Sequence, residues 1–548
     1  MALKAKAKSP SAANDDEPEI VSPRSLELVI ALVGYAGAGC TEIANKLDIN
    51  LTTKGYRCVK IKLSKLIESL SDENIFEVSE NQSTIGIERL ARATELQNQG
   101  DKLRNDYTND VIVREAIKQF SLNRDGREIG SSRIAFILDS VKHLDEVELL
   151  RELYGPSFRL LAVHCSKPIR LGRLFGDVHS DAKFRGADED EVLSFMERDE
   201  KDQNRNPSGQ QVRDAFYLGD YFLDNEHKND DKDKLQVLEQ IDKFTDLLLG
   251  KRLFRPSSSE SGIYHAFSAS RHSACLSRQV GASLQSEDGR IISNGSNEVP
   301  KFNGGVYGDE STGDENRCFG WEFKSGAIEF TGCHNTRKKQ EIKNNIAKWL
   351  SDDFFKNIAT KLKEEDSNFK EDAFLENIKK GIAVNEKELE QAPGISELLE
   401  FSRSIHAEMD ALFSAARAGH STKNTVLYCT TFPCHNCARH MVTAGVKEVV
   451  YVEPYVKSLA LELHSDSLTD RKEESKNSNN NPIKMLISPF TGVGPRMFDL
   501  HFKKTQELKN ADGSYIEPSG DRPVEAVRIE TLKENETRVL KPLKDINE

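Results

Sequence analysis

The sequence lacks a long apolar run. No stretch approaches the roughly 18 residues that a membrane-spanning helix requires. The first residues, MALKAKAKSPSAANDDEPEI, contain lysines but no apolar segment, which is not typical of a signal peptide. Residues 1–24 are therefore expected to form a disordered arm, and the protein is expected to be cytoplasmic, without a membrane contact.

Basic charge and cysteine are also scarce. The chain has 76 Lys and Arg against 89 Asp and Glu, a formal net charge of -13, which is not the balance of a nucleic-acid coat protein. A local basic groove remains compatible with it. The nine cysteines are scattered, and Cys434 and Cys437 form the one closely spaced pair. In a large chain this pattern favours a reducing compartment, where close cysteines hold metal more often than they form a disulfide.

The chain is too long for a single core, so its 548 residues predict two or three domains. In residues 25–251 the apolar runs LELVIALV, SSRIAFILDSV and FRLLAVHCS alternate with helical patterns. Such alternation predicts an α/β domain with a mostly parallel sheet covered on both faces. The polar run MERDEKDQNRNPSGQQ inside it is expected to be a surface segment.

A second pattern occupies residues 262–505. Two strands joined by a turn, then a helix, a strand, a helix and a strand predict a three-layer αβα domain around one sheet. A region rich in lysine and glutamate at about 335–395 has helical apolar spacing, so it is expected to be a helical insertion. Residues 506–548 are expected to be a charged, loosely attached C-terminal tail.

Two short motifs of the second domain each stand where a helix is expected to begin. HAE contains His406 and Glu408, and PCHNC contains Cys434 and Cys437. Catalytic zinc sites take three ligands from the protein and leave one position for water, so the histidine and the two cysteines are the predicted zinc ligands. Glu408 is predicted to take a proton from that water and pass it to a leaving amine. The combination H-x-E…P-C-x-x-C is that of zinc deaminases of nucleobases.

Each motif alone has a plainer interpretation. H-x-E by itself is commonly surface decoration, and P-C-x-x-C by itself is commonly a structural zinc site or a redox pair. A purely structural zinc would need a fourth protein ligand, for which His435 and His440 are at hand, although His435 is expected to be exposed. Cys318, Cys333 and His334 could form a second metal site, but their irregular spacing favours buried or free thiols.

A glycine-rich segment, GYAGAGCT, follows the first apolar run and precedes a helical pattern. It has the G-x-x-x-x-G frame of a phosphate-binding loop, but a cysteine replaces the usual lysine. The negative charge of a transferred phosphoryl group is therefore poorly neutralised. We expect nucleotide binding without efficient phosphoryl transfer; a turn without a ligand and an active kinase are the alternatives. The predicted nucleotide-binding residues are Gly34, Gly37, Gly39, Cys40 and Thr41, with Asp139 and Thr41 as partners of Mg²⁺ and Lys142 as a substitute charge.

At these motifs the segment from about 263 to 502 resembles the cytidine and deoxycytidylate deaminase superfamily. The resemblance lies in RQVGASL, SNGSNEVP, HAEMDAL, PCHNCARHMVTAGVKEVVYVEPY and FTGVGPRMF. It implies that Asn297, in the G-x-N-x-x-P turn, contacts the nucleoside. It also implies that residues 453–466 recognise the phosphate end through Lys457 and His464, for which a solvated loop is the alternative. Asp410 stands where many members have asparagine.

A P-loop, kinase-like domain fused to a zinc deaminase is similar to the bacterial anti-phage dCTP deaminases. That kinship implies a hydrolase that converts dCTP, and dCMP as well, to the uracil nucleotide and ammonia, and so depletes dCTP in antiviral defence. It further implies a homo-oligomer whose N-terminal domain binds a regulatory nucleotide, with a small RNA as another restraint. The alternatives are a deaminase of cytosine or adenine within a polynucleotide, and a nucleotide-dependent kinase or switch with a secondary deaminase domain.

Overall fold

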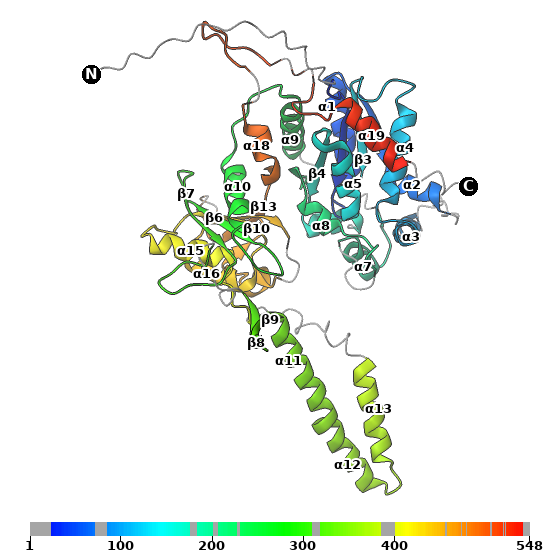
Figure 1. Ribbon diagram of the computed structural model, residues 1–548, viewed down its shortest axis with the longest axis vertical. Coiled ribbons are helices and arrows are strands. Elements are labelled where there is room, and N and C mark those ends of the chain that lie inside the picture. The colour runs from blue at the N-terminus through cyan, green and yellow to red at the C-terminus, as the bar shows by residue number, and fades with distance from the viewer. Residues whose placement is uncertain are drawn as a thin grey trace.

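The computed structural model describes residues 23–540 apart from 72–84, 176–182, 201–205, 227–230, 309–317, 385–400, 455–457, 473, 478, 480, 505–506, 519 and 521. Two six-stranded sheets stand beside each other, and each is the centre of an α/β body (Figure 1). The predicted fold class, a parallel-sheet domain followed by a three-layer αβα domain with a helical insertion, is confirmed. The boundaries assigned to the domains stay predictions.

The first sheet has the strand order β14-β5-β4-β1-β3-β2. All six residues of β1, LVIALV, are buried, as expected for a strand with helices on both faces. Strands β1 to β5 are parallel neighbours, so their carboxyl ends meet at one edge of the sheet, where the glycine-rich loop lies. The strands are β1 (Leu28–Val33), β2 (Arg57–Lys62), β3 (Ile134–Asp139), β4 (Phe158–His164), β5 (Tyr221–Asp224) and β14 (Gly492–Val493).

Helices cover both faces of this sheet. One face packs against α1 and α9, and the other against α4, α5 and α8. The remaining helices surround the carboxyl edge of the strands. The helices are α1 (Cys40–Thr53), α2 (Leu63–Leu70), α3 (Ile85–Asp106), α4 (Val111–Asn123), α5 (Leu144–Tyr154), α6 (Lys167–Leu174), α7 (Glu189–Glu200), α8 (Val212–Tyr217) and α9 (Asp231–Leu249).

The second sheet has the order β12-β13-β11-β10-β6-β7. Strands β10, β11, β13 and β12 are parallel neighbours, whereas β6 is antiparallel to β10 and forms a hairpin with β7. The strands are β6 (Gly281–Gln285), β7 (Ile291–Ser296), β10 (Val426–Thr431), β11 (Glu448–Glu453), β12 (Leu468–Thr469) and β13 (Met485–Pro489).

Alternating side chains of the second sheet enter two different cores. Leu427 and Val449 pack with α15 (Ala407–Arg417) and α16 (His435–Thr443). Tyr428 and Val450 face the other way and share a core with α10 (Ser258–Ser270) and with helices of the first body. The second sheet is therefore the middle of three layers, and the first body helps to cover one of its faces.

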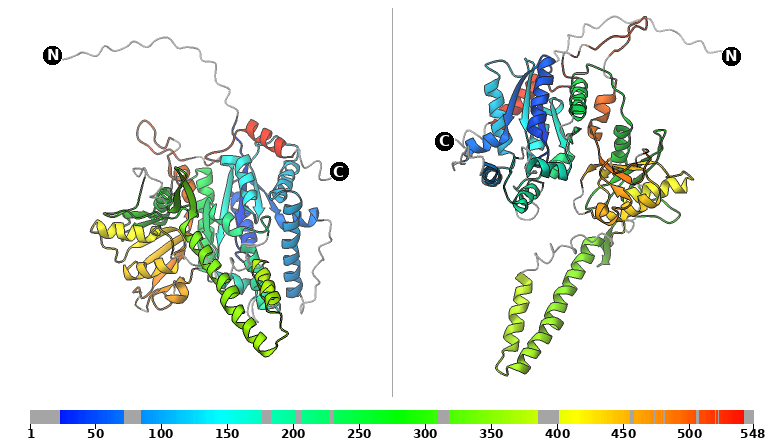
Figure 2. Two further views of the ribbon diagram at one scale, coloured as in Figure 1. Left: turned by 60° about the horizontal axis from the view of Figure 1, so that its bottom comes forward. Right: turned by 180° about the vertical axis from the view of Figure 1, so that it is seen from behind.

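The lysine- and glutamate-rich region forms an arm that projects from the second body (Figure 1, Figure 2). A hairpin of β8 (Phe319–Lys324) and β9 (Ala327–Cys333) leads into it. Helices α11 (His334–Trp349), α12 (Phe355–Glu365) and α13 (Glu371–Val384) follow, with a π-helical turn at Leu350–Phe354. The end of the predicted insertion, after residue 384, lies outside the described residues.

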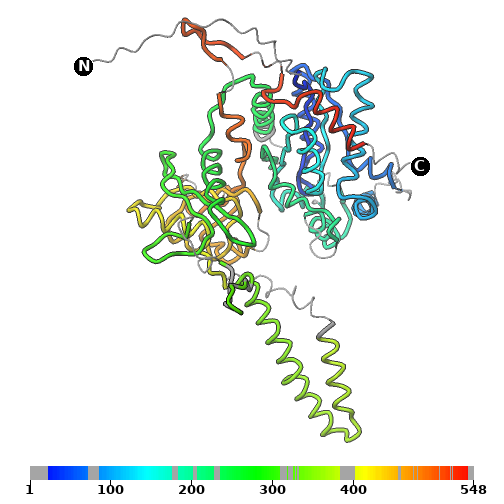
Figure 3. The backbone as a smooth tube through the Cα atoms, viewed as in Figure 1, coloured from blue at the N-terminus to red at the C-terminus, as the bar shows by residue number. Residues whose placement is uncertain are grey.

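The last helix among the described residues lies back on the first body, so the expectation of a loosely attached tail is wrong for this helix. Helix α19 (Ile529–Leu540) packs against α4 and α5. In Figure 3 it is the red helical segment beside the first body. Its buried positions, Ile529, Leu532, Glu536 and Val539, recur at helical spacing. The sequence did not predict a packed helix here, because Glu536 takes one of the four buried positions and interrupts the apolar pattern.

Two further expectations concern the start of the chain and the membrane. Residues 1–22 of the expected arm lie outside the described residues, and Arg24 forms a bridge with Arg528. Among the described helices none is long and apolar enough to cross a membrane.

A buried ion-pair network ties α19 to the first body. The Arg124 guanidinium donates hydrogen bonds of 2.8 Å to both carboxylate oxygens of Glu536 and pairs with Glu27 on its other side. The Tyr154 hydroxyl donates to the same Glu536 carboxylate at 2.8 Å. We predict that Glu536→Ala lowers the free energy of unfolding by about 3 kcal/mol, because it leaves a buried guanidinium short of one partner.

The measurement is chemical denaturation of the full chain. Lys533→Ala is the matched control, because it removes an exposed pair with Glu128 from the same helix and should change stability much less. Equal losses for the two variants would contradict the prediction.

Candidate metal centre and phosphate-binding loop

Three of the predicted ligands meet where two helices begin. His406 is the N-cap residue of α15 and Cys434 is the N-cap residue of α16, with Cys437 in the first turn of the latter. The two helices pack against each other on the same face of the second sheet. The Nδ1 atom of His406 lies 3.3 Å from each of the two sulfur atoms, and the three candidate ligand atoms all lie within 4.8 Å of one another.

A glycine allows α15 to start this close to the sheet. A Cβ atom at Gly295, in β7, would lie 2.2 Å from the carbonyl oxygen of Ala407 and 2.3 Å from the amide nitrogen of Ala411. A side chain at this position would push the first turn of α15 away from β7 and would carry His406 with it. Gly295 precedes the turn that contains Asn297, so one segment positions both.

The three side chains fit a zinc ion by distance and by charge. With Zn–S near 2.3 Å and Zn–N near 2.0 Å, a tetrahedral site separates sulfur from nitrogen by roughly 3.5 Å, close to the distances of 3.3 Å found here. Hydrogen bonding to Cys437 and to His406 lowers the pKa of Cys434 to about 4, and the Cys434 sulfur raises the pKa of His406 to about 9. Without a metal ion the sulfur of Cys434 therefore carries the negative charge, whereas burial and the neighbouring Cys434 raise the pKa of Cys437, so a bound cation is needed to make both sulfurs thiolates.

Glu408 follows the candidate ligand His406 by two residues. It belongs to the first turn of α15 and is 4 % exposed. Burial raises the pKa of its carboxyl group, and the nearby Cys434 sulfur adds to the effect. A carboxyl group in these surroundings can both accept and return a proton near neutral pH.

Within the described part of the chain, the group of metal-binding side chains at this centre consists of His406, Cys434 and Cys437, without a fourth protein ligand. His435 is half-buried rather than exposed as predicted, and its Nδ1 atom has no hydrogen-bond partner within the described residues. The Nδ1 atom of His440 lies 2.6 Å from the carbonyl oxygen of Asn436. The arrangement favours an open coordination position over a closed structural site.

The predicted nucleoside contact, Asn297, serves the neighbouring backbone in this structure. Its Oδ1 atom accepts the N–H of Val280 at 2.7 Å, and its Nδ2 atom donates to the carbonyl oxygen of Arg278 at 2.8 Å. Asp410 accepts the N–H of Ser296 at 3.0 Å, so it holds the same turn from α15. The two side chains thus hold the polypeptide around the mouth of the candidate metal centre.

Of the two predicted phosphate ligands, the structure describes one, His464. Lys457 lies outside the described residues. His464 is half-buried at the end of the short helix α17 (Ala460–Leu463). The Ser458 hydroxyl donates to the carbonyl oxygen of Pro433 at 2.7 Å, which ties this segment to the residue before Cys434.

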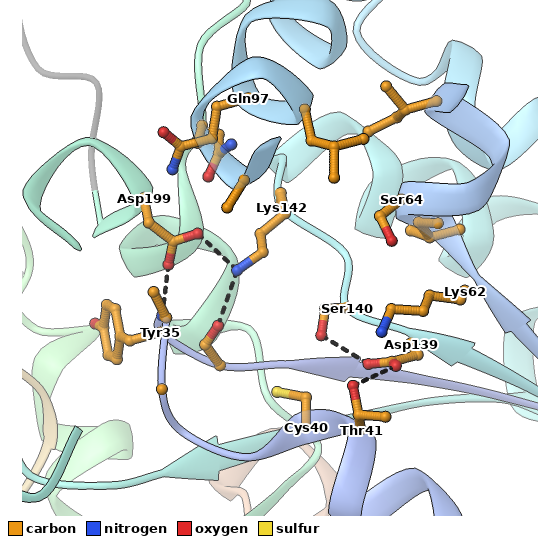
Figure 4. A pocket seen from close by; sticks show the side chains of 18 of the residues that line it. Tyr35, Cys40, Thr41, Lys62, Ser64, Gln97, Asp139, Ser140, Lys142 and Asp199 are labelled. Atoms are coloured by element: carbon orange, nitrogen blue, oxygen red, sulfur yellow. Dashed lines mark hydrogen bonds and ion pairs between the residues drawn. The ribbon is translucent and has the colours of Figure 1, made fainter. Parts of the chain in front are cut away.

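The glycine-rich loop lines a cavity of about 790 Å³ at the carboxyl edge of the first sheet (Figure 4). Gly37 and Gly39 have φ angles of 83° and 88°, which L side chains rarely adopt. The Thr41 hydroxyl donates to the Asp139 carboxylate at 2.6 Å, so the two predicted Mg²⁺ partners meet. Cys40 is buried, and burial raises the pKa of its thiol to about 11, so its side chain brings no charge to the loop.

Lys142 reaches the loop, as the sequence suggested, but a carboxylate accompanies it. Its ammonium group donates to the carbonyl oxygen of Gly34 at 3.2 Å and pairs with Asp199 at 2.7 Å (Figure 4). The Asp199 carboxylate also accepts the N–H of Ala36 at 2.7 Å. Asp199 is 3 % exposed and belongs to α7, so this part of the predicted surface segment is buried in the cavity wall. Only the polar run around it was visible in the sequence, and no motif singled it out.

The suggested second metal site does not assemble among the described residues, because Cys318, Cys333 and His334 are not grouped within ligand distance of one another. Cys318 is buried, and its sulfur lies 3.8 Å from the Ser402 hydroxyl. The other group of metal-binding side chains in the described part of the chain is His164, Asp224 and Glu226, at the ends of β4 and β5.

Comparison with known proteins assigns the second body to a class. Residues 257–453 match the family model of the cytidine and deoxycytidylate deaminase zinc-binding region. The deoxycytidylate deaminase of Enterobacteria phage T2 is 43 % identical over 54 residues, which are 10 % of this chain and 29 % of that enzyme. The chain thus spans under a third of the length of this curated relative. It carries a deaminase domain of the cytidine and deoxycytidylate type, with a region that binds zinc in that family.

Two solved structures are similar to parts of this chain at low identity. The dCMP deaminase of cyanophage S-TIM5 covers 43 % of this chain and all of its own, with 16 % identity and a TM-score of 0.21. Shikimate kinase of Bacteroides thetaiotaomicron covers 40 % of this chain and 98 % of its own, with 15 % identity and a TM-score of 0.23.

We predict that the purified protein holds one zinc ion per chain and that Cys437→Ser reduces this content to less than about one tenth, because a catalytic site supplies only three protein ligands. Elemental analysis measures the metal directly, independently of activity. Cys58→Ser is the matched control, since Cys58 is a half-buried thiol of the first sheet. Full zinc content in Cys437→Ser would exclude this centre as the metal site.

Proposed function

We propose that the protein is a zinc-dependent hydrolase that deaminates free deoxycytidine nucleotides, dCTP and dCMP, to the uracil nucleotides and ammonia. The observation that carries this proposal is the buried meeting of His406, Cys434 and Cys437 beside Glu408. These four residues lie in the segment that matches the deaminase family model. In the reaction the bond between C4 and the amino nitrogen breaks, the oxygen of water takes its place, and ammonia leaves.

The chain's own residues divide the work. The imidazole and the two thiolates would hold zinc, which when bound makes water a nucleophile near neutral pH. Glu408 is the proton carrier: it accepts a proton from water and returns it to the ring nitrogen or to the departing amine. Its burial supports this role, because a raised pKa makes the carboxylate a stronger base, which takes a proton from water more readily than an ordinary glutamate does.

Charge supports free nucleotides over a polynucleotide as the substrate. The formal net charge of the chain is -13, which opposes the approach of a polyanion. A deaminase of a flipped base would call for a basic groove with aromatic platforms. A small nucleotide needs only a local cluster of cations.

We propose the first body as a nucleotide-binding regulatory module. Thr41 and Asp139 would meet a Mg²⁺ ion, and Lys142 brings the positive charge that Cys40 does not. Gln97 supports a whole nucleotide as the ligand, because it lines the same cavity and its buried Oε1 atom has no hydrogen-bond partner within the described residues. Depletion of dCTP in anti-phage defence is the biological role proposed, and homo-oligomers and a restraining small RNA remain predictions.

Ammonia release from a substrate panel of dCTP, dCMP, CTP and single-stranded DNA tests the activity. We expect turnover of the two deoxycytidine nucleotides, and a fall of at least about 100-fold in Glu408→Gln, because general acid–base catalysis contributes roughly 10²–10⁴. The variant should keep its zinc. Glu287→Gln is the control, since this carboxylate is exposed at the β6–β7 turn. Full activity in Glu408→Gln, or turnover of DNA alone, would refute the proposal.

The regulatory pocket has a separate test that needs no turnover. A phosphate entering the loop competes with Asp199 for the Ala36 N–H and for Lys142. Asp199→Asn should therefore bind Mg²⁺–ATP about tenfold more tightly, and Lys142→Met should bind it more weakly. Calorimetry measures both, with the exposed Asp190→Asn as control. Unchanged or weaker binding by Asp199→Asn would show that the carboxylate does not occupy the phosphate site.

A further inference from the structure

A second cavity, of about 340 Å³, lies between the two bodies. Helix α8 of the first body forms one wall, with Asp214 and Tyr217. The deaminase body forms the other, with Arg271, Arg278 and Arg496 and the acidic Glu453. Three guanidinium groups against two carboxylates leave the walls positive in a chain whose formal net charge is -13.

Two of the three guanidinium groups have no carboxylate partner within the described residues. Arg278 pairs with Glu453. Arg271 lies over the ring of Phe267 at 4.3 Å and donates to the side-chain oxygen of Gln279 at 3.0 Å. Arg496 lies over the ring of Tyr217 at 5.7 Å. Aromatic faces and an amide oxygen hold these two groups in place but do not neutralise them.

Like charges crowd this cavity. Burial lowers the pKa of Arg496, and the neighbouring guanidinium groups of Arg151 and Arg271 lower it further. The three guanidinium groups are exposed to solvent, which screens their repulsion, but an anion that joins them would still relieve it. Arginine forks match phosphate oxygens bidentately, so a phosphate chain is the anion that this geometry suits.

The walls of the cavity continue into the candidate metal centre. The carbonyl oxygen of Arg278 accepts the hydrogen bond from Asn297, and the carbonyl oxygen of Glu453 accepts the N–H of Phe432 at 2.7 Å, two residues before Cys434. Glu453 is the last residue of β11, so the cavity lies beyond the carboxyl end of a parallel strand, where α/β sheets bind ligands. Segments that border the metal centre therefore also carry Arg278 and Glu453 of the cavity wall.

We propose that this cavity receives the polyphosphate of the nucleotide substrate, and that Arg271 and Arg496 select triphosphate over monophosphate. The proposal rests on the proposed deamination of deoxycytidine nucleotides. The volume is at the lower end of the roughly 300–1,000 Å³ typical of ligand pockets, which suits part of a nucleotide rather than a whole second one. Because Tyr217 and Asp214 belong to α8, the first body takes part in substrate selection.

Steady-state kinetics with dCTP and dCMP test the proposal on Arg496→Gln and Arg271→Gln. We expect the KM for dCTP to rise about tenfold, the loss of one charge-assisted phosphate contact, while the KM for dCMP changes less than about twofold and kcat is unchanged. Arg290→Gln is the matched control, because its side chain is 83 % exposed at the far hairpin. Arg496→Lys, which keeps the charge but loses the fork, should give an intermediate KM for dCTP. Tripolyphosphate should compete with dCTP in the wild type and less so in Arg496→Gln.

Equal effects on dCTP and dCMP, or none, would overturn the proposal, because a merely structural arginine does not distinguish the two. A changed response to a second nucleotide with an unchanged KM for dCTP would also overturn it and would make the cavity an effector site. If the wild type releases ammonia from neither nucleotide, the proposed function itself fails. If it turns over dCTP and the variants keep the wild-type ratio of KM values, the cavity proposal fails alone.

Discussion

The closeness of two helix starts is the constraint on which the deaminase half depends. His406 and Cys434 cap α15 and α16, and both caps must stand over the same face of the sheet for one nitrogen to lie 3.3 Å from two sulfurs. The missing side chain of Gly295 permits it on one side. On the other side the helix N-terminus favours the thiolate form of Cys434, whose sulfur accepts the N–H of Cys437. Packing and electrostatics thus favour the same arrangement.

The two bodies are joined more closely than a linker between independent domains would allow. Val450 of the second sheet and Phe222 of the first belong to one buried core, and β14, which follows the last parallel strand of the second sheet, pairs with β5 of the first. The buried Glu260 of α10 accepts the N–H of Val493 in β14 at 2.9 Å. Movement of the first body relative to the second would disturb this shared core, so the two bodies are not free to move independently.

Local patterns of the sequence predicted the parts that depend on neighbouring residues. The buried strand β1, the loop with Gly37 and Gly39, and the two motifs that contain helix N-caps all follow from periodicity and spacing. The structure brings together His406, Cys434 and Cys437 as expected. Contacts between residues far apart in the chain could not be predicted from these local patterns. Asp199 lay in a polar run, and Glu536 lay in a charged tail, yet both are buried because a distant cation, Lys142 or Arg124, accompanies them. A sequence shows a charge but not the opposite charge that allows its burial.

Both proposed phosphate sites hold a cation that already has an internal carboxylate. Lys142 pairs with Asp199 at the glycine-rich loop, and Arg278 pairs with Glu453 between the bodies. In each pair the carboxylate is buried and the cation is partly exposed, so the pair stabilises the protein without its ligand chiefly by giving the buried carboxylate a partner. A phosphate must then displace or outcompete that carboxylate, which lowers affinity but makes binding depend on more than one negative charge. At the loop the carboxylate belongs to α7, so phosphate binding there would also release a contact between that helix and the glycine-rich loop. An acidic chain can in this way bind nucleotides at two local clusters of cations while its net negative charge repels polyanions.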